Sequence, residues 1–189
     1  MRAHDEDTRI TALALAAGRG DRRALADWVR ATQADVWHLV AHLTDVHRAD
    51  GLTQETYLRA LSSLPRFAGR SSSRTWLLSI ARRVVVDHIR CSSTRFRLTR
   101  HPEWDPIADA RHGDQVGFED IVELTLLLDA LEPERREALV LTQILGLTYH
   151  EAAEICRCPV GTIRSRVARA RDDLLDSSTD CGRPRHVTP

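Results

Sequence analysis

The sequence predicts an all-α protein made of two small helical domains joined by a flexible linker. Apolar residues recur three and four positions apart in most segments, and no segment shows the alternation of apolar and polar residues that is typical of a strand. Proline and glycine are sparse, with 7 and 9 residues in a chain of 189, and 42% of the residues are hydrophobic. A chain of this length and composition can bury helical cores without disulfide bonds.

The first domain is predicted to cover residues 8–97. Its helical segments are expected at 21–46, 49–64 and 72–90. Breaks are expected at "HRADG" (47–51) and at "PRFAGRSSS" (65–73), where proline, glycine and serine accumulate. The next segment, 98–117, carries two prolines and two glycines and has little periodicity, which is typical of an interdomain linker.

The second domain is predicted at 118–176, and residues 177–189 are expected to form a disordered tail. Four helices are expected in the domain, at about 118–131, 133–145, 148–156 and 160–175. Pro133 suits a first helical position, Gly146 suits a helix end, and "TYHE" (148–151) has the spacing of a capping box. Because Pro159 disfavours helix at the residue before it, a tight turn should join the last two helices into a helix-turn-helix.

The last helix is expected to have two different faces. At about 100° per residue, one narrow stripe collects the apolar side chains of Ile163, Val167, Ala170 and Leu174. The opposite face and its flanks collect Thr162, Arg164, Ser165, Arg166, Ala168 and Arg169. Small hydrogen-bonding side chains can approach base edges while guanidinium groups contact phosphates, so this face suits duplex DNA. The alternative is a solvated basic helix.

Two groups of side chains have a spacing that could suit a metal ion. Cys156, Cys158 and His150 offer at most three ligands, with no second pair nearby. His38 and His42 are four residues apart, but no cysteine or carboxylate cluster is near them in the sequence. We interpret Cys156 as a core residue and the histidines as polar or half-buried positions. The sequence therefore predicts no metal and no cofactor.

The charge of the chain is zero overall but unevenly distributed. Residues 66–100 hold nine arginines and one acid, residues 103–137 hold eleven acids and three arginines, and a second basic stretch follows at 157–171. Basic stretches of this kind are typical of nucleic-acid contacts. The acidic stretch is interpreted either as a solvated linker or as a shield for the basic surfaces. No signal peptide and no apolar run of roughly 18 residues is present, which predicts a cytoplasmic protein without membrane contact.

The first basic stretch combines arginines with aromatic and hydroxyl side chains. In "RFAGRSSSRTW" (66–76), Phe67 and Trp76 flank three serines, a mixture that binds single-stranded nucleic acid by stacking, hydrogen bonding and phosphate contact. On the helix that follows, Arg82, Arg83 and Arg90 fall on one side and apolar residues on another. A place for Trp76 in the core is an equally good interpretation of the residues alone.

Three segments together resemble a known family. They are "LTQETYLRAL" (52–61), "PRFAGRSSSRTWLLSIARRVVVDHIR" (65–90) and "REALVLTQILGLTYHEAAEICRCPVGTIRSRVARARDDL" (136–174). In order, they are similar to regions 2 and 4 of the extracytoplasmic-function (ECF) sigma factors of the sigma-70 family, and within it to the actinobacterial sigma C group. The resemblance implies that 8–97 is sigma region 2 and 118–176 is sigma region 4. It also implies binding to promoter DNA and to the β′ clamp helices and β flap of core RNA polymerase, with an anti-sigma factor as a candidate further partner.

The resemblance implies three sets of site residues. Contact with core polymerase is expected from Asp50, Leu52, Gln54, Glu55 and Leu58, although Gly51 stands where the family commonly has a second acid. Recognition and melting of the minus-10 element, with capture of a flipped base, are expected from Phe67, Arg70, Ser71, Ser72, Arg74, Trp76, Arg82, Arg83 and Arg90. Recognition of the minus-35 duplex is expected from Thr162, Arg164, Ser165, Arg166 and Arg169. From the helical geometry, Ser165 and Arg169 face bases, and Arg164 and Arg166 mainly face phosphates.

Two other classes of function fit the sequence less well. A helix-turn-helix regulator that acts on duplex DNA without polymerase is the alternative, but such a protein usually carries a ligand or dimerisation domain where residues 8–97 have a second basic surface. An enzyme is not expected, because the sequence has no Gly-rich phosphate loop, no nucleophile elbow and no evident carboxylate pair.

Overall fold

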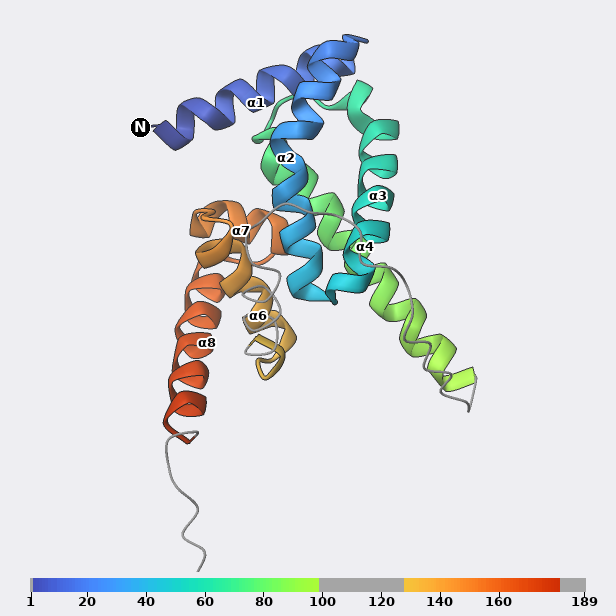
Figure 1. Cartoon of the computed structure of the whole chain (residues 1–189). Helices are drawn as coiled ribbons and strands as arrows, with labels where there is room; N and C mark the ends of the chain where they lie inside the picture. The colour runs from blue at the N-terminus through green and yellow to red at the C-terminus, as the bar shows by residue number, and fades with distance from the viewer. Residues whose placement is uncertain (1, 99–127, 181–189) are drawn as a thin grey trace, which may run out of the picture.

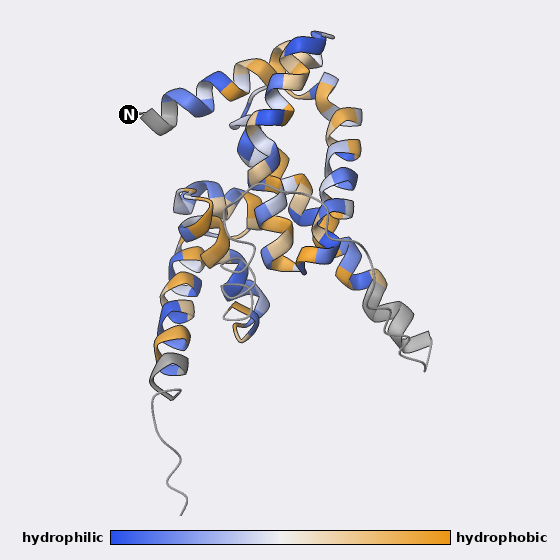
Figure 2. Cartoon of the chain, in the orientation of Figure 1, coloured by the Kyte–Doolittle hydropathy of each residue, from blue (hydrophilic) through white to orange (hydrophobic). Residues whose placement is uncertain are grey.

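The computed structural model describes residues 2–98 and 128–180, and the chain is helical over most of these residues (Figure 1). The all-α prediction is confirmed. The predicted linker beyond Leu98, most of the helix expected at 118–131 and the last nine residues lie outside the described residues. Apolar residues lie mainly where helices meet, and polar residues lie mainly on their outer sides (Figure 2). Among the described helices, none is long and apolar enough to cross a membrane.

Four helices and a short 3-10 turn form the first part of the chain. They are α1 (Arg2–Gly18), α2 (Arg22–Leu43), α3 (Val46–Ser63), η1 (Leu64–Arg66) and α4 (Ser73–Leu98). α2, α3 and α4 pack against one another, and α1 lies across α2, η1 and α4 (Figure 1). The buried side chains of Trp28, Leu39 and Leu77 form the centre of this core.

The break between α2 and α3 lies earlier than the sequence predicts, so the expected break at "HRADG" is wrong. Helix α3 begins at Val46 because Asp45 caps it. The Asp45 carboxylate accepts the backbone N–H of Arg48 at 3.0 Å and the Arg48 guanidinium at 2.7 Å. Gly51 is therefore an internal residue of α3. The helical region also starts before residue 8, because α1 begins at Arg2.

From Pro133 to Asp180, three helices and one π-helical turn form the second part. They are α6 (Pro133–Leu139), η2 (Val140–Ile144), α7 (Tyr149–Cys156) and α8 (Val160–Asp180). The predicted capping box between Thr148 and Glu151 is confirmed, and Gly146 ends the preceding segment with a φ of 67°. Of the predicted tail at 177–189, residues 177–180 continue α8, and the rest lies outside the described residues. No proline or glycine interrupts the chain there before Gly182.

The two parts of the chain are in direct contact. α7 packs against α4, while α6 and η2 contact α2 (Figure 1). Buried residues of both parts, among them Val85, Leu141 and Ile155, belong to one continuous hydrophobic cluster. The second part therefore covers one side of α2 and α4.

Candidate nucleic-acid and polymerase interfaces

Helices α7 and α8 form the predicted helix-turn-helix. α7 ends at Cys156, and Arg157 takes a left-handed conformation with a φ of 54°. The backbone N–H groups of Arg157 and Cys158 then donate to the carbonyls of Glu154 and Ala153, at 3.3 and 3.1 Å. Backbone hydrogen bonds thus fix the turn.

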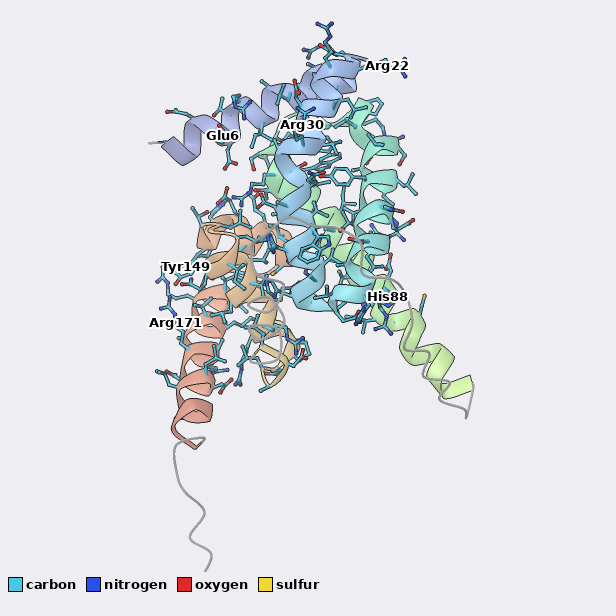
Figure 3. The ribbon with its side chains drawn as sticks, in the orientation of Figure 1. Glu6, Arg22, Arg30, His88, Tyr149 and Arg171 are labelled. Atoms are coloured by element: carbon cyan, nitrogen blue, oxygen red, sulfur yellow. The ribbon has the colours of Figure 1, made fainter. Side chains whose placement is uncertain are left out.

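The apolar stripe of α8 is buried as predicted. Ile163, Val167 and Ala170 are fully buried, and Leu174 packs partly against the same cluster. The C-terminal half of the helix is also held by polar contacts. Arg171, labelled in Figure 3, donates to the Gln143 side-chain oxygen at 2.7 Å. Helix α8 is therefore fixed in its orientation about its own axis.

The opposite face of α8 is open to solvent. Arg164, Ser165 and Arg169 are exposed, while Thr162 and Arg166 are half-buried. Within 2–98 and 128–180, no carboxylate lies at ion-pair distance from Arg164, Arg166 or Arg169. All five predicted minus-35 residues therefore lie on one helix, and the three arginines among them are available to an external partner.

The side chains whose spacing could suit a metal ion have other surroundings in the structure. Burial and the Glu137 carboxylate raise the pKa of the Cys156 thiol to about 12, and Cys156 belongs to the hydrophobic core. His38 and His42 stack with ring centroids 6.1 Å apart. Burial, His38 and Arg136 together lower the pKa of His42 to about 4. In the part of the chain that the structure describes, no three His, Cys, Asp or Glu side chains are grouped to hold a metal ion.

The loop between η1 and α4 carries an aromatic cluster. Phe67 packs on Trp76 with ring centroids 4.8 Å apart, and Trp76 packs on the buried Trp28 at 6.3 Å. Trp76 is half-buried, so it joins the core to the loop. The structure thus gives Trp76 the core contact that the sequence left open, while one part of its surface remains accessible.

The other loop residues divide into an exposed tip and a helix cap. Arg70 is exposed and Ser71 is half-buried. The Ser72 hydroxyl oxygen accepts the backbone N–H of Thr75 at 3.1 Å, and it thereby caps α4. Ser72 is therefore occupied by the fold, whereas Arg70 is free to meet a ligand.

Arg74 is turned toward the protein. Its Nε donates to the Asp35 carboxylate on α2 at 2.6 Å, and its Nη2 donates to the backbone carbonyl of Leu145 at 2.7 Å. Leu145 ends the η2 segment, where the last carbonyls of a helix have no partner within the helix. Arg74 thus joins α4 to α2 and to the second part of the chain.

Arg82 makes a two-armed ion pair with Glu137. Its Nε and Nη2 donate to the two Glu137 carboxylate oxygens at 2.6 and 3.1 Å. The side chain of Glu137 is 8% exposed and that of Arg82 is 26% exposed, so the pair is largely removed from water. Charge-assisted pairs of this geometry are among the stronger hydrogen bonds of proteins. Arg83 and Arg90 are exposed on the same helix.

One face of α3 presents most of the predicted polymerase contacts. Asp50, Gln54 and Leu58 follow one another at intervals of four and are exposed, with Leu58 at 65%. Trp37 on α2 donates its indole N–H to the Asp50 carboxylate at 2.9 Å and so fixes that side chain. Leu61, 38% exposed, extends the same face.

Two predicted polymerase contacts lie away from this face. Leu52 packs against the hydrophobic core. Glu55 is half-buried and accepts the Arg59 Nε at 2.7 Å, while Arg59 also pairs with Asp87 on α4. Both residues therefore support the helix that carries the exposed stripe.

Four residues of these surfaces were not predicted as site residues. Glu137, Asp35 and Leu145 hold arginines that the sequence assigns to the minus-10 contact, and each pairs across a long separation in sequence that no local pattern reveals. Leu61 could have been found, because it lies three residues after Leu58 and therefore on the same helical face.

Comparison with known proteins identifies both parts of the chain. The family model of sigma-70 region 2 matches residues 28–95, and that of sigma-70 region 4 matches residues 121–174. The ECF RNA polymerase sigma factor SigC of Mycobacterium tuberculosis is 57% identical over 171 residues, which cover 90% of this chain and 91% of that protein. The chain belongs to the ECF sigma factors. The predicted family is thus confirmed.

Other ECF sigma factors extend the similarity. EcfG of Rhodopseudomonas palustris is 36% identical over 147 residues, covering 71% of this chain and 76% of that protein. The solved structure of the sigma factor RpoE of Bartonella quintana, in complex with the anti-sigma factor NepR, has a TM-score of 0.69 at 27% identity. The structural match covers 80% of this chain and 94% of the RpoE chain. The helical fold described above is therefore shared with a solved ECF sigma factor.

Proposed function

We propose that this ECF sigma factor is a non-catalytic cytoplasmic subunit that binds core RNA polymerase and directs initiation at promoters with specific minus-10 and minus-35 elements. The observation that carries the proposal is the open face of α8, on which three arginines without an acidic partner among the described residues surround a small hydroxyl side chain. A helix of this composition can enter a major groove. Ser165 and Arg169 contact base edges, and Arg164 and Arg166 contact phosphates.

Region 2, residues 8–97, supplies the other two contacts in this proposal. The exposed stripe of Asp50, Gln54 and Leu58 on α3 binds the β′ clamp helices. The loop between η1 and α4 captures a base that is flipped out of the minus-10 element, with Arg70 on the backbone and the accessible part of the Phe67 and Trp76 cluster beside the base. Region 4, residues 118–176, then binds the minus-35 element and the β flap.

Binding to both elements requires the chain to open. The two promoter elements lie about 25 base pairs apart, which is about 85 Å along the duplex at ~3.4 Å per base pair. In the free chain, however, α7 packs directly on α4, and Arg74 and Arg82 are held by region 4. We infer that core polymerase separates the two regions and releases both arginines to the displaced strand. As with NepR and the Bartonella quintana relative, an anti-sigma factor is a candidate partner.

Transcription by a reconstituted holoenzyme tests the proposal. Core RNA polymerase with this chain should initiate on a small set of fragments in a genomic promoter library, and these fragments should share two elements at a fixed spacing. Core enzyme alone and core enzyme with a chain that carries Leu58→Glu should not select them. If the chain instead binds a palindromic duplex and never associates with core polymerase, it is a helix-turn-helix regulator and the proposal is wrong.

A further inference from the structure

One face of α1 lies against the loop that we propose to capture the minus-10 base. This face is formed by Thr11, Leu15 and Gly18, at positions i, i+4 and i+7, and the buried residues Ile10 and Ala14 anchor the helix to the core beside it. Helix α1 precedes residue 28, where the match to the region 2 family model begins.

Each of the three residues supports a different point of the loop. The Thr11 hydroxyl oxygen accepts the backbone N–H of Ser73, the first residue of α4, at 3.0 Å. The Leu15 methyl groups lie 3.6 and 3.7 Å from the position that a Cβ on Gly69 would occupy, beneath the middle of the loop. A Cβ on Gly18 would lie 2.7 Å from the Leu64 carbonyl oxygen, at the start of η1.

The end of the loop is held from two sides. Ser73 is fully buried, and its hydroxyl oxygen accepts the indole N–H of Trp28 at 3.2 Å, while its backbone N–H is bound by Thr11. That N–H belongs to the first turn of α4 and has no partner within the helix. Without Thr11, a buried donor would be unsatisfied, and the start of α4 would move to regain a partner.

The middle of the loop has little other support. Gly69 has a φ of 67°, a conformation that glycine adopts without strain, and it is exposed on its outer side. The neighbouring Ala68 and Arg70 are exposed as well. The height of the loop above the core is therefore determined largely by the Leu15 side chain beneath it.

From these contacts we infer that α1 positions the minus-10 loop, with Thr11 and Leu15 as positioning residues that tune which flipped base the loop accepts. The inference rests on the proposed capture of a base by this loop. A base pocket distinguishes the four bases by hydrogen bonds and packing contacts, and a movement much smaller than a base alters these contacts. A shift in the position of the loop therefore changes how well each base fits. Contacts of α8 with the minus-35 element are unaffected by such a shift.

The test measures base preference with the reconstituted holoenzyme of the full chain. A library with randomised minus-10 and minus-35 elements is transcribed by the wild type and by the Thr11→Val, Thr11→Ser and Leu15→Ala variants. Thr11→Val keeps the side-chain shape but removes the acceptor, whereas Thr11→Ser keeps the acceptor. Thr8→Val is the matched control, because Thr8 is an exposed threonine of the same helix.

We expect Thr11→Val and Leu15→Ala to change the relative use of bases at one minus-10 position by about 3- to 10-fold, the effect of one hydrogen bond or contact. Minus-35 preferences should be unchanged in both variants. Thr11→Ser and Thr8→Val should each keep the minus-10 preferences of the wild type. If both α1 variants keep the wild-type minus-10 preferences, at full or at uniformly reduced activity, the inference is wrong. Should Thr11→Val fail to fold, Leu15→Ala decides alone. Failure of the proposed function is distinct, since the wild type itself would then select no promoter.

Discussion

Two arginine-bearing surfaces of this chain differ in what their side chains face. On α8, Arg164, Arg166 and Arg169 have no acid at ion-pair distance among the described residues. On α4, Arg82 is bound by both carboxylate oxygens of Glu137, and Arg74 by a carboxylate and a backbone carbonyl of two other segments. A count of arginines along the sequence does not show which of the two surfaces is available. Their availability differs because tertiary contacts occupy one of them.

The difference suggests an order of events in promoter binding. The proposed minus-35 face is accessible in the free chain, and under the proposed function the minus-10 face becomes complete only after region 4 leaves α4. Glu137 is the last acid of the acidic stretch 103–137, which we interpreted from the sequence as a solvated linker or as a shield for the basic surfaces. For this one residue, the structure gives the shielding contact.

Loss of the Glu137 charge should have the largest effect on the difference in availability between the arginines of α8 and those of α4. Glu137→Gln leaves Arg82 without its ionic partner, and removal of one partner from a buried pair costs about 3–5 kcal/mol. Because the Arg82 side chain is 26% exposed, solvent recovers part of this cost. We expect the free variant to bind a single-stranded minus-10 oligonucleotide about 10- to 100-fold more tightly than the wild type, measured by fluorescence anisotropy.

Glu134→Gln is the matched control for this prediction. It removes the same charge from the same helix at an exposed position. The control should bind the oligonucleotide as the wild type does. An unchanged affinity of a folded Glu137→Gln chain would mean that the Arg82 contact does not limit access to the minus-10 surface.

Truncation of Arg169 should have the next largest effect, on the open surface. Arg169→Ala should cost about 1–3 kcal/mol of promoter binding and relax the preference at one minus-35 position, because a guanidinium donates to base edges. Minus-10 preferences should not change. The measurement is the base frequency in transcripts selected from the randomised library. A wild-type preference at every minus-35 position would remove Arg169 from base recognition.

Truncation of Arg164 should weaken binding without altering sequence preference. As a phosphate contact, it contributes affinity through counterion release. For Arg164→Ala, we expect the slope of log K against log salt for a minus-35 duplex to fall in magnitude by about 1. Measurement of the DNA affinity at several salt concentrations checks this slope. If Arg164→Ala keeps the wild-type slope but loses the preference for one base, Arg164 contacts a base and the role assigned to it is wrong.

The smallest effect concerns the α2–α6 contact and depends on pH. Burial, His38 and Arg136 lower the pKa of His42 to about 4, so the folded state holds this imidazole neutral. The pKa of this imidazole in the unfolded chain is 6.5. The contribution of His42 to the free energy of unfolding is therefore complete well above pH 6.5 and is lost progressively as the pH falls toward 4. Between pH 7 and 6 the loss should be roughly 0.7 kcal/mol.

Urea unfolding of His42→Gln and wild type at these two pH values measures this effect. The variant should lose less stability than the wild type between pH 7 and 6. His47→Gln, which changes an exposed histidine of α3, should keep the wild-type dependence. An identical pH dependence in all three chains would show that His42 does not titrate as described.

Local patterns in the sequence predicted the parts of this structure that local contacts determine. The stripe of Ile163 and Val167 and the capping box of Thr148 each depend on residues three or four apart, and both are confirmed. The break assigned to "HRADG" is wrong, because Gly51 is tolerated within a helix that the Asp45 cap begins earlier. A glycine lowers helix stability, but a strong cap and tertiary packing can outweigh it.

The contacts between the regions could not be predicted in this way. Arg82 and Glu137 are 55 residues apart, and nothing in the neighbourhood of either identifies the other. Thr11 and Ser73 are separated by 62 residues, and a threonine in an N-terminal helix has no signal for the cap it provides. The residues that share a face of α8 were therefore predictable from helical periodicity, but the contacts that occupy Arg82 and support the start of α4 were not.

Energy transfer between two dyes tests most directly whether region 4 covers α4 in the free chain and leaves it on binding to polymerase. The dyes are placed at Ala34→Cys on α2 and His150→Cys on α7, two exposed positions next to Asp35 and Glu151, whose charges both act on Arg74, after Cys91, Cys158 and Cys181 are changed to serine. The buried Cys156 is retained because its raised thiol pKa makes it a poor nucleophile. We predict one population with high transfer in the free protein and a single low-transfer population after core RNA polymerase is added. Equal transfer efficiency in both states, or low transfer in the free protein, would contradict the account.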